Sequence, residues 1–289
     1  MRKAPSASSA HDIHRVVQAQ FGPAATAYGT SASHGDPEQL AELVRLAEPR
    51  PTDLALDIAT GAGHVALAFA PHVAHVVAYD LTPQMLEETE RRAAARGLGN
   101  VRVREGAAEA LPFDDATFDI VAVRLAPHHF ADIQRAVHEM ARVAKPGARV
   151  VVADTTVPED DELDREINRI ETLRDPSHVR DYRPSEWTTI LERAGLHVVH
   201  CAVDSYTEGG RMRFSDWTSR MRTPPPVVAE LETLFRTASP RLAHALDIRV
   251  DGASITFCLP KVTLAATKPV GAADRTADKN RSEPRRAAD

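Results

Sequence analysis

The sequence predicts an α/β fold, a Rossmann-like, doubly wound parallel sheet with helices on both faces. Along residues 54–156, short apolar runs rich in Val, Ile and Ala alternate with stretches whose apolar residues recur at helical spacing. The first run leads into a glycine turn, and an acid ends the second run, as in a nucleotide-binding βαβ unit. Parallel strands of this kind need helices on both faces to bury them.

The core elements follow one another at short intervals. Residues 83–97 form a predicted helix that ends at Gly97, and residues 131–147 form another that Pro146 and Gly147 are expected to stop. Apolar runs bounded by turn residues predict strands at residues 54–59, 75–80, 101–106, 118–124 and 148–156.

The segment before the core predicts a lid. Residues 1–12 are rich in Ser and Ala and are expected to be disordered. Residues 13–50 hold two predicted helices separated by a polar hinge at residues 29–35. We therefore expect a helical lid at residues 13–50 in front of a cofactor-binding core at residues 51–157.

The segment after the core predicts a substrate-side part, residues 158–267. It starts with a charged helix inserted after the fifth strand, and its next helix carries a capping signal at Ser185. Residues 268–289 are poor in large apolar side chains and are expected to form a disordered tail. The predicted elements in between are helices at residues 161–175, 184–195 and 214–246 and strands at residues 197–203 and 253–267.

Composition excludes several classes of function. The formal net charge of -6 gives no excess of cations for general nucleic-acid binding. No run approaches the ~18 apolar residues of a membrane helix, and the first residues lack a secretory signal. Cys201 and Cys258 lack zinc-ligand spacing and are expected to be buried thiols. We expect a cytoplasmic protein whose partner is a small molecule, and a homodimer is an alternative that the sequence leaves open.

Residues 54–80 predict a site for a nucleoside. Asp57 ends the first strand, and Gly61 and Gly63 form a turn that a ligand can approach closely because glycine has no Cβ. Asp80 ends the second strand, where a βαβ unit places an acid to accept both ribose hydroxyls.

Two classes of cofactor fit such a turn. The segment from Gly61 to Ala66 also satisfies the dinucleotide pattern G-x-G-x-x-A, so an NAD(P)-dependent oxidoreductase is a rival interpretation. Asp57 favours S-adenosylmethionine, because its charge would attract a cationic amino group and repel a pyrophosphate. The acidic loop after the third strand suits an adenine ring, and no tyrosine is followed four residues later by the lysine of hydride chemistry. S-adenosylmethionine is the methyl donor of methyltransferases, and a protein that binds it without transferring the methyl group is a further alternative.

Several blocks of sequence resemble a known family. DIATGAG, AYDLTPQML, GAAEALPFDDATFDIV and RVAKPGARVVVAD resemble class I methyltransferases of the ubiquinone/menaquinone C-methyltransferase (type 11) kind. RLAPHHF, LRDPSHVRDYRPSEW and FSDWTSRM resemble an uncharacterised bacterial subgroup that acts on small molecules. The resemblance covers residues 21–268. It implies a seven-stranded sheet with an N-terminal lid and an insert after strand five. It also implies S-adenosylmethionine as cofactor and O- or C-methylation of a small aromatic or apolar metabolite.

The resemblance also implies the residues that hold the cofactor. Ala59 stands where the family has a further glycine, and Ala107 stands where an aspartate meets the adenine amino group, so that Glu109 or a water must substitute. Arg124 is expected to line the cofactor with its backbone, and Tyr28 to close over the sulfonium or simply to pack. The full expected set is Tyr28, Asp57, Ala59, Gly61, Gly63, Asp80, Leu81, Met85, Ala107, Ala108, Glu109 and Arg124.

The expected catalytic residues follow the fourth strand. His128 and His129 are adjacent, so we expect one to face the cleft as a base or substrate contact and the other to be satisfied by the protein. The alternative is that both only shape the loop. Asp154 ends the fifth strand and either contacts substrate or caps the strand. No metal site is expected, because His72 and His75 have no third ligand nearby. The candidates for a substrate wall are Arg174, Asp175, His178, Tyr182 and Trp187, but Trp187 follows a cap at helical spacing and is expected in the core instead.

Overall fold

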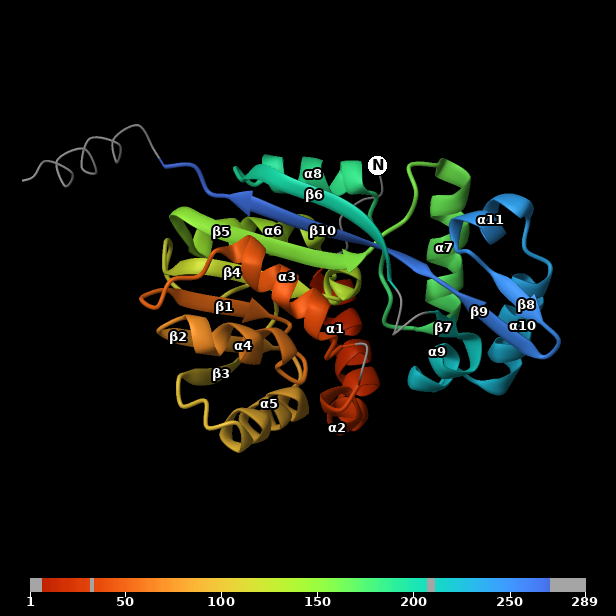
Figure 1. Ribbon diagram of the computed structural model, residues 1–289, viewed down its shortest axis with the longest axis horizontal. Coiled ribbons are helices and arrows are strands. Elements are labelled where there is room, and N and C mark those ends of the chain that lie inside the picture. Colours follow the sequence, from red (N-terminus) through yellow and green to blue (C-terminus); the bar gives the residue numbers. More distant parts are fainter. Residues whose placement is uncertain (1–6, 32–33, 207–210, 271–289) are drawn as a thin grey trace, which may run out of the picture.

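A central sheet of seven strands organises the computed structural model, which describes residues 7–31, 34–206 and 211–270 (Figure 1). The strand order is β3-β2-β1-β4-β5-β10-β6. The first five strands of this order are parallel, whereas β10 runs antiparallel to both of its neighbours. The strands are β1 (Leu54–Ile58), β2 (His75–Asp80), β3 (Val101–Glu105), β4 (Phe118–Arg124), β5 (Ala144–Thr155), β6 (His197–Tyr206) and β10 (Leu259–Thr267).

Helices bury both faces of this sheet, as predicted. One face packs on α3 (Pro37–Ala47), α4 (His64–Phe69) and α5 (Pro83–Ala95), through a core that includes Leu43 and Phe69. The other face packs on α6 (Ile133–Val143) and α8 (Pro184–Arg193), through a core that includes Met140 and Trp187. The predicted doubly wound, seven-stranded fold is therefore confirmed.

A second lobe stands beside the carboxyl end of the parallel strands (Figure 1). Its separate core joins apolar side chains of the helices to a small sheet with the strand order β7-β9-β8. The chain reaches the lobe after β5, so the predicted helical insert is present. The elements of the lobe are α7 (Asp161–Arg174), β7 (Met212–Arg213), α9 (Phe214–Arg220), α10 (Pro225–Arg236), α11 (Pro240–Ala245), β8 (Arg249–Asp251) and β9 (Ser254–Phe257).

The N-terminal helices bridge the two parts. The Gln18 side chain of α1 donates to the carbonyl of Leu81 on the sheet side, 2.8 Å away, and the Gln20 side chain donates to the carbonyl of Met221 in the second lobe, 2.8 Å away. The N-terminal segment is therefore a strap that contacts both the sheet and the second lobe. Its elements are α1 (Ala7–Phe21), η1 (Gly22–Ala24) and α2 (Ala25–Gly29).

Several predicted boundaries need correction. Helix α1 begins at Ala7, so the disorder expected up to residue 12 is wrong for residues 7–12. The disorder expected from residue 268 is wrong for Lys268, whose backbone bonds Gly147 and Ala148. Residues 1–6 and 271–289 of the expected disordered ends lie outside the described residues. The helix predicted at 131–147 ends at Val143, because strand β5 already starts at Ala144 beside β4. The single strand predicted at 253–267 is two strands, β9 and β10, in different sheets.

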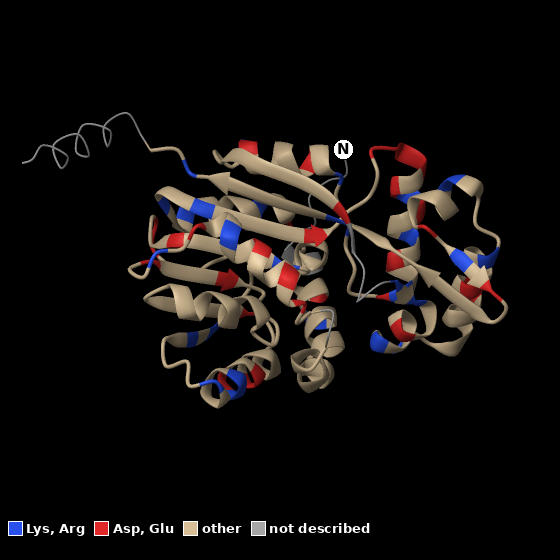
Figure 2. Cartoon of the chain, in the orientation of Figure 1, with Lys and Arg blue, Asp and Glu red and all other residues tan. Residues whose placement is uncertain are grey.

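Two smaller expectations also differ. The cap of α8 is Arg183, whose backbone N–H donates to the Glu186 carboxylate at 3.0 Å, whereas Ser185 lies inside the helix and bonds Glu159. Cys201 is exposed rather than buried, because it lies on the edge strand β6. Lys and Arg are interspersed with Asp and Glu over both lobes (Figure 2). Among the helices of the described residues, none combines the length and apolarity that crossing a membrane requires.

Candidate functional site

The turn after β1 adopts the left-handed backbone that glycine favours. Ala59, Gly61 and Gly63 have φ values of 52°, 53° and 80°. A Cβ added to Gly61 would meet nothing within 4 Å, so this position opens onto free space. A Cβ on Gly63 would lie 2.7 Å from the Thr89 side chain of α5, so Gly63 allows close packing behind the turn. Ala59 carries the strain that the missing glycine would have avoided.

Asp57 is buried at the end of β1, 1% exposed. Its Oδ2 accepts hydrogen bonds from Thr60 Oγ1 at 2.5 Å and from the Ala66 N–H at 2.9 Å. Burial raises the pKa of Asp57 from 3.8 to about 7, even though both hydrogen bonds oppose the rise. A cation placed beside this carboxylate would stabilise its charged form and so offset the rise in its pKa.

Asp80 ends β2 on the other side of the turn. Its Oδ2 accepts from the Gly61 N–H and its Oδ1 from the Thr82 N–H, both at 2.8 Å. Burial raises the pKa of Asp80 from 3.8 to about 6, against the pull of these hydrogen bonds. These hydrogen bonds hold the carboxylate at the base of the turn, at the end of β2.

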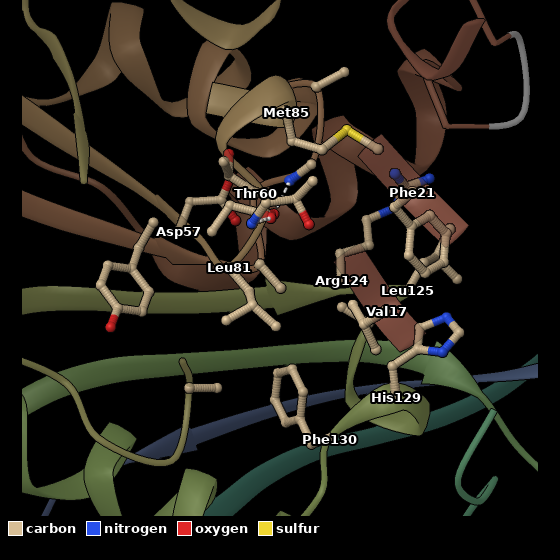
Figure 3. Close-up of a pocket in the computed structure, with 18 of the residues that line it drawn as sticks. Val17, Phe21, Asp57, Thr60, Leu81, Met85, Arg124, Leu125, His129 and Phe130 are labelled. Atoms are coloured by element: carbon tan, nitrogen blue, oxygen red, sulfur yellow. Dashed lines mark hydrogen bonds between the residues drawn. The ribbon is translucent and has the colours of Figure 1, made fainter. Parts of the chain in front are cut away.

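A cleft of about 970 Å³ opens beside this turn at the carboxyl ends of β1, β2 and β4 (Figure 3). We call it the main cleft. Gly63 and His128 are not among its lining residues; the first lies behind the turn and the second lines a neighbouring chamber. The predicted site residues that line the main cleft are Tyr28, Asp57, Ala59, Gly61, Asp80, Leu81, Met85, Ala107, Ala108, Glu109, Arg124 and His129.

Glu109 lines the main cleft but is held by other groups. Its Oε1 accepts from the Ala131 N–H at 2.8 Å, and its Oε2 lies 3.3 Å from Nε2 of His14 on the strap. Burial alone would raise the pKa of Glu109, yet the hydrogen bonds from His14 and the backbone keep it below its usual value. The carboxylate therefore fixes α1 over the cleft beside Ala107.

The strap residues reach the same cleft. The Tyr28 ring lies edge-on to Phe21 at 5.6 Å, and its hydroxyl is 3.7 Å from Met221 Sδ. The Arg124 guanidinium donates to the His34 carbonyl at 2.8 Å and to the Gln39 side-chain oxygen at 3.0 Å. Arg124 thus ties the end of β4 to the segment that precedes α3.

A second chamber of about 550 Å³ adjoins the main cleft, and Phe21, Tyr28, His34, Leu125 and His129 line both. The second lobe supplies its far wall. That wall includes Arg174 and Asp175, whereas the other wall candidates His178 and Tyr182 do not line it. Trp187 is fully buried in the sheet core, as its helical spacing predicted. The apolar part of the second chamber consists of Phe21, Leu125, Met212, Trp217, Met221 and Leu259.

His129 lies where the two spaces meet. Its Nδ1 is 3.0 Å from the Ser177 carbonyl and 3.2 Å from Ser177 Oγ, which itself donates to Asp175 at 2.6 Å. Both Ser177 oxygens are therefore acceptors, so Nδ1 carries the proton and Nε2 keeps a lone pair. Burial lowers the pKa of His129 well below 6.5, and the charge of His128 adds to this shift. His129 is thus a neutral acceptor.

His128 is in the opposite electrostatic situation. Asp154 accepts from its Nδ1 at 2.6 Å and from its backbone N–H at 2.9 Å. Burial alone would lower the pKa of His128, but the charge and hydrogen bond of Asp154 outweigh it and raise the pKa from 6.5 to about 9. His128 is thus a cation beside a neutral histidine, with ring centroids 4.1 Å apart.

One group of metal-ligand types occurs within the described residues. His128, Asp154 and Asp181 each offer an atom within 4.8 Å of the others. Hydrogen bonds already hold these side chains in place. His128 bonds Asp154, and Thr155 Oγ1 donates to Asp181 at 2.6 Å.

Sequence reasoning missed some of the cleft residues. His14, Val17 and Phe21 recur at helical spacing and share one face of α1, a signal that could have predicted them. His34 and His64 gave no such signal, because tertiary packing brings them together with ring centroids 6.5 Å apart. Burial lowers the pKa of His64 from 6.5 to about 4, so it is neutral.

Known proteins share this architecture. Residues 56–152 match a family model described as a methyltransferase domain. The uncharacterized methyltransferase YcgJ of Bacillus subtilis (strain 168) is 35% identical over 250 residues, 86% of this chain and 97% of YcgJ. A YcgJ crystal structure covers 81% of this chain and 99% of its own, with a TM-score of 0.75.

Two further proteins agree with this assignment. The structure of a Bacillus halodurans C-125 protein, described as a candidate methyltransferase, is 33% identical and has a TM-score of 0.77, over 81% of this chain and 100% of its own. The demethylmenaquinone methyltransferase of Thermus thermophilus is 44% identical over 105 residues, 36% of this chain and 47% of that protein. With its seven-stranded sheet and long matches to methyltransferases, the chain belongs to the class I methyltransferase family.

Proposed function

We propose that this methyltransferase uses S-adenosylmethionine and transfers the methyl group to oxygen or carbon of a small molecule with an aromatic or apolar body. The main support is the left-handed turn at Gly61, which opens onto the main cleft between the buried carboxylates of Asp57 and Asp80. A pyrophosphate at this turn would face the Asp57 carboxylate, whereas a sulfonium compound with an amino group adds positive charge there.

The residues of the main cleft fit this cofactor. S-adenosylmethionine, when bound, supplies an electrophilic methyl group. Asp57 would attract the amino group, Asp80 would accept the ribose hydroxyls, and Leu81 and Met85 would pack on the base. The residues that would contact the amino group, the ribose and the base all line this one cleft. Tyr28 would present an aromatic ring toward positive charge.

The two histidines then have separate roles in the transfer. Nε2 of His129 would take the proton of the accepting hydroxyl or carbon acid, since its lone pair is free while Nδ1 donates to Ser177. His128, held in its charged form by Asp154, would donate from Nε2 to an oxygen of the same substrate. A positioned base accelerates such a reaction by about 10²–10⁴-fold when its pKa is near the working pH, and the low pKa of His129 reduces this factor.

The apolar body of the substrate has its support in the second chamber. Leu125, Met212, Trp217, Met221 and Leu259 provide aromatic and thioether surface next to the histidines. The relative named a demethylmenaquinone methyltransferase acts, by its name, on a quinone precursor, and a phenol or quinone precursor is the acceptor that we propose here.

Ligand binding tests the cofactor. S-adenosylhomocysteine at 100 times its dissociation constant should stabilise the protein by about 2.7 kcal/mol in a thermal unfolding assay. NAD and NADP should give no shift. Asp80→Ala should abolish the stabilisation, whereas Asp115→Ala, an exposed aspartate paired with Arg142, should leave it unchanged. A shift with NAD or NADP alone would favour the oxidoreductase alternative instead.

Transfer itself needs a second experiment. A metabolite extract is incubated with the protein and methyl-labelled S-adenosylmethionine, and labelled products are identified by mass spectrometry. We expect label in small phenolic or quinone-like compounds, lost in His129→Ala. If the cofactor binds but no soluble metabolite acquires label, the protein is a binding protein of this fold rather than an enzyme.

A further inference from the structure

Helix α7 brings an ion pair into the wall of the second chamber. Glu171 and Arg174 lie one turn apart on α7, and both line the chamber. Arg174 Nη1 donates to Glu171 Oε2 at 2.7 Å, and its Nε donates to the Trp217 carbonyl at 3.2 Å. The guanidinium also lies over the Trp217 ring, 4.7 Å from its centroid. Arg174 is therefore fixed from three sides.

The other oxygen of Glu171 has no partner. Glu171 is 4% exposed, and its Oε1 is buried without a hydrogen-bond donor among the described residues. A buried carboxylate oxygen left in this state lowers the stability of the folded protein. Buried polar groups are almost always paired, so an orphan in a pocket wall indicates that the donor arrives with a ligand.

The surroundings define what kind of donor fits. Arg174 already neutralises Glu171. Arg220 and the charged His128 line the same chamber, so a cationic donor would be repelled. A carboxylate has no hydrogen to donate to Oε1 of Glu171. The neighbouring surface is the apolar group formed by Met212, Trp217 and Leu259. A neutral group that donates a hydrogen bond, carried on an aromatic ring, matches both features.

We propose that the second chamber selects substrates whose ring carries, besides the methyl-accepting atom, a neutral hydrogen-bond donor such as a hydroxyl or primary amide, which Glu171 Oε1 binds. This inference rests on the proposed function and adds the specificity group to it. Glu171 is then a substrate-binding residue and Arg174 a positioning residue that holds it. Substrates that offer only hydrocarbon at this position are disfavoured.

Matched phenol probes test the proposal. 4-Methylphenol, 4-hydroxybenzyl alcohol, 4-hydroxybenzamide and 4-hydroxybenzoate differ only in the group opposite the hydroxyl. Their affinities are measured by ligand-observed NMR titration with the protein saturated with S-adenosylhomocysteine. The alcohol and the amide should bind at least about tenfold more tightly than the methyl and carboxylate probes, the factor expected for a hydrogen bond to a charged group.

Variants separate binding from structure. Glu171→Gln keeps an acceptor for Arg174 but can present an N–H to the ligand, so the preference should reverse toward the carboxylate probe. The double change Glu171→Leu with Arg174→Met removes the buried pair; it should keep or raise the melting temperature and abolish the preference. Glu230→Gln is the control, because Glu230 forms only an exposed pair with Arg169 of α7.

The outcomes are distinct. Equal affinities for the methyl and alcohol probes, no binding of either donor probe, or a Glu171→Gln protein with the wild-type preference would each overturn the proposal. Binding of S-adenosylhomocysteine is recorded in the same samples, so its absence counts against the proposed function. Its presence without a donor preference counts against this inference alone.

Discussion

Protonation of Asp57 should control cofactor affinity in the neutral pH range. Its pKa of about 7 in the folded protein means that the carboxylate which attracts the amino group is half-protonated at pH 7. The fraction ionised falls about tenfold between pH 8 and pH 6, so affinity for S-adenosylhomocysteine should fall about tenfold. Asp80, with a pKa of about 6, adds about a further twofold.

The stability of the free protein should change in the opposite direction. The folded-state pKa of Asp57 is raised above its ordinary value of 3.8, so the folded form binds more protons than the unfolded form between these values. The contribution of Asp57 to stability is therefore present at low pH and is lost as the pH rises through about 7. When the pH is lowered from 8 to 6, the free energy of unfolding of the free protein should rise by about 1.4 kcal/mol.

Asp57→Asn is the matched variant for both effects. An asparagine oxygen can still accept from Thr60 and Ala66, but the group no longer titrates. Buried histidines titrate in both proteins and cancel in the difference. Calorimetric titration with S-adenosylhomocysteine and thermal unfolding at pH 6, 7 and 8 measure the two quantities. The reasoning is refuted if affinity in the wild type and the variant depends on pH in the same way.

Three further changes test other parts of the site. Asp154→Asn removes the charge that keeps the pKa of His128 near 9. In a pH–rate profile, the wild-type rate should fall as the pH rises through about 9. The rate of the variant should already fall as the pH rises through 6.5 or below. Ala59→Gly relieves a φ of 52°, so thermal unfolding should show a gain of up to about 1 kcal/mol instead of the usual glycine loss. Gly63→Ala should cost about 2 kcal/mol, about twice the cost of Gly97→Ala, since both have positive φ but only Gly63 has a side chain 2.7 Å from the added Cβ. Equal losses at the two glycines would contradict the packing argument.

The sheet was predictable where local pattern and long-range pairing agree. The strands that begin at Leu54, His75 and Phe118 lie where the alternation of apolar runs predicted them. The prediction of a single strand at residues 253–267 failed because one apolar run crosses between two sheets at Cys258. Pro260, two residues later, was the only local sign of the change within this run. Strand β5 extends back to Ala144 because pairing with β4 overrides the stop expected at Pro146.

The site was predictable along the turn and the ends of β1 and β2. Asp57 and Asp80 meet because parallel neighbours end at the same edge. The contrast between His128 and His129 was not predictable, since it depends on Asp154 and Ser177, which lie 26 and 48 residues away along the chain. Charge and tautomer follow from partners that only the folded chain supplies.

The position of the strap affects how ligands enter and leave the two spaces. Gln20 accepts a hydrogen bond from Arg222 through its carbonyl and donates to the Met221 carbonyl, while Gln18 holds the opposite rim. Phe21 and Tyr28 line both the main cleft and the second chamber, so a displacement of the strap would open both at once. If cofactor and substrate bind as proposed, their two products would then leave through the same opening.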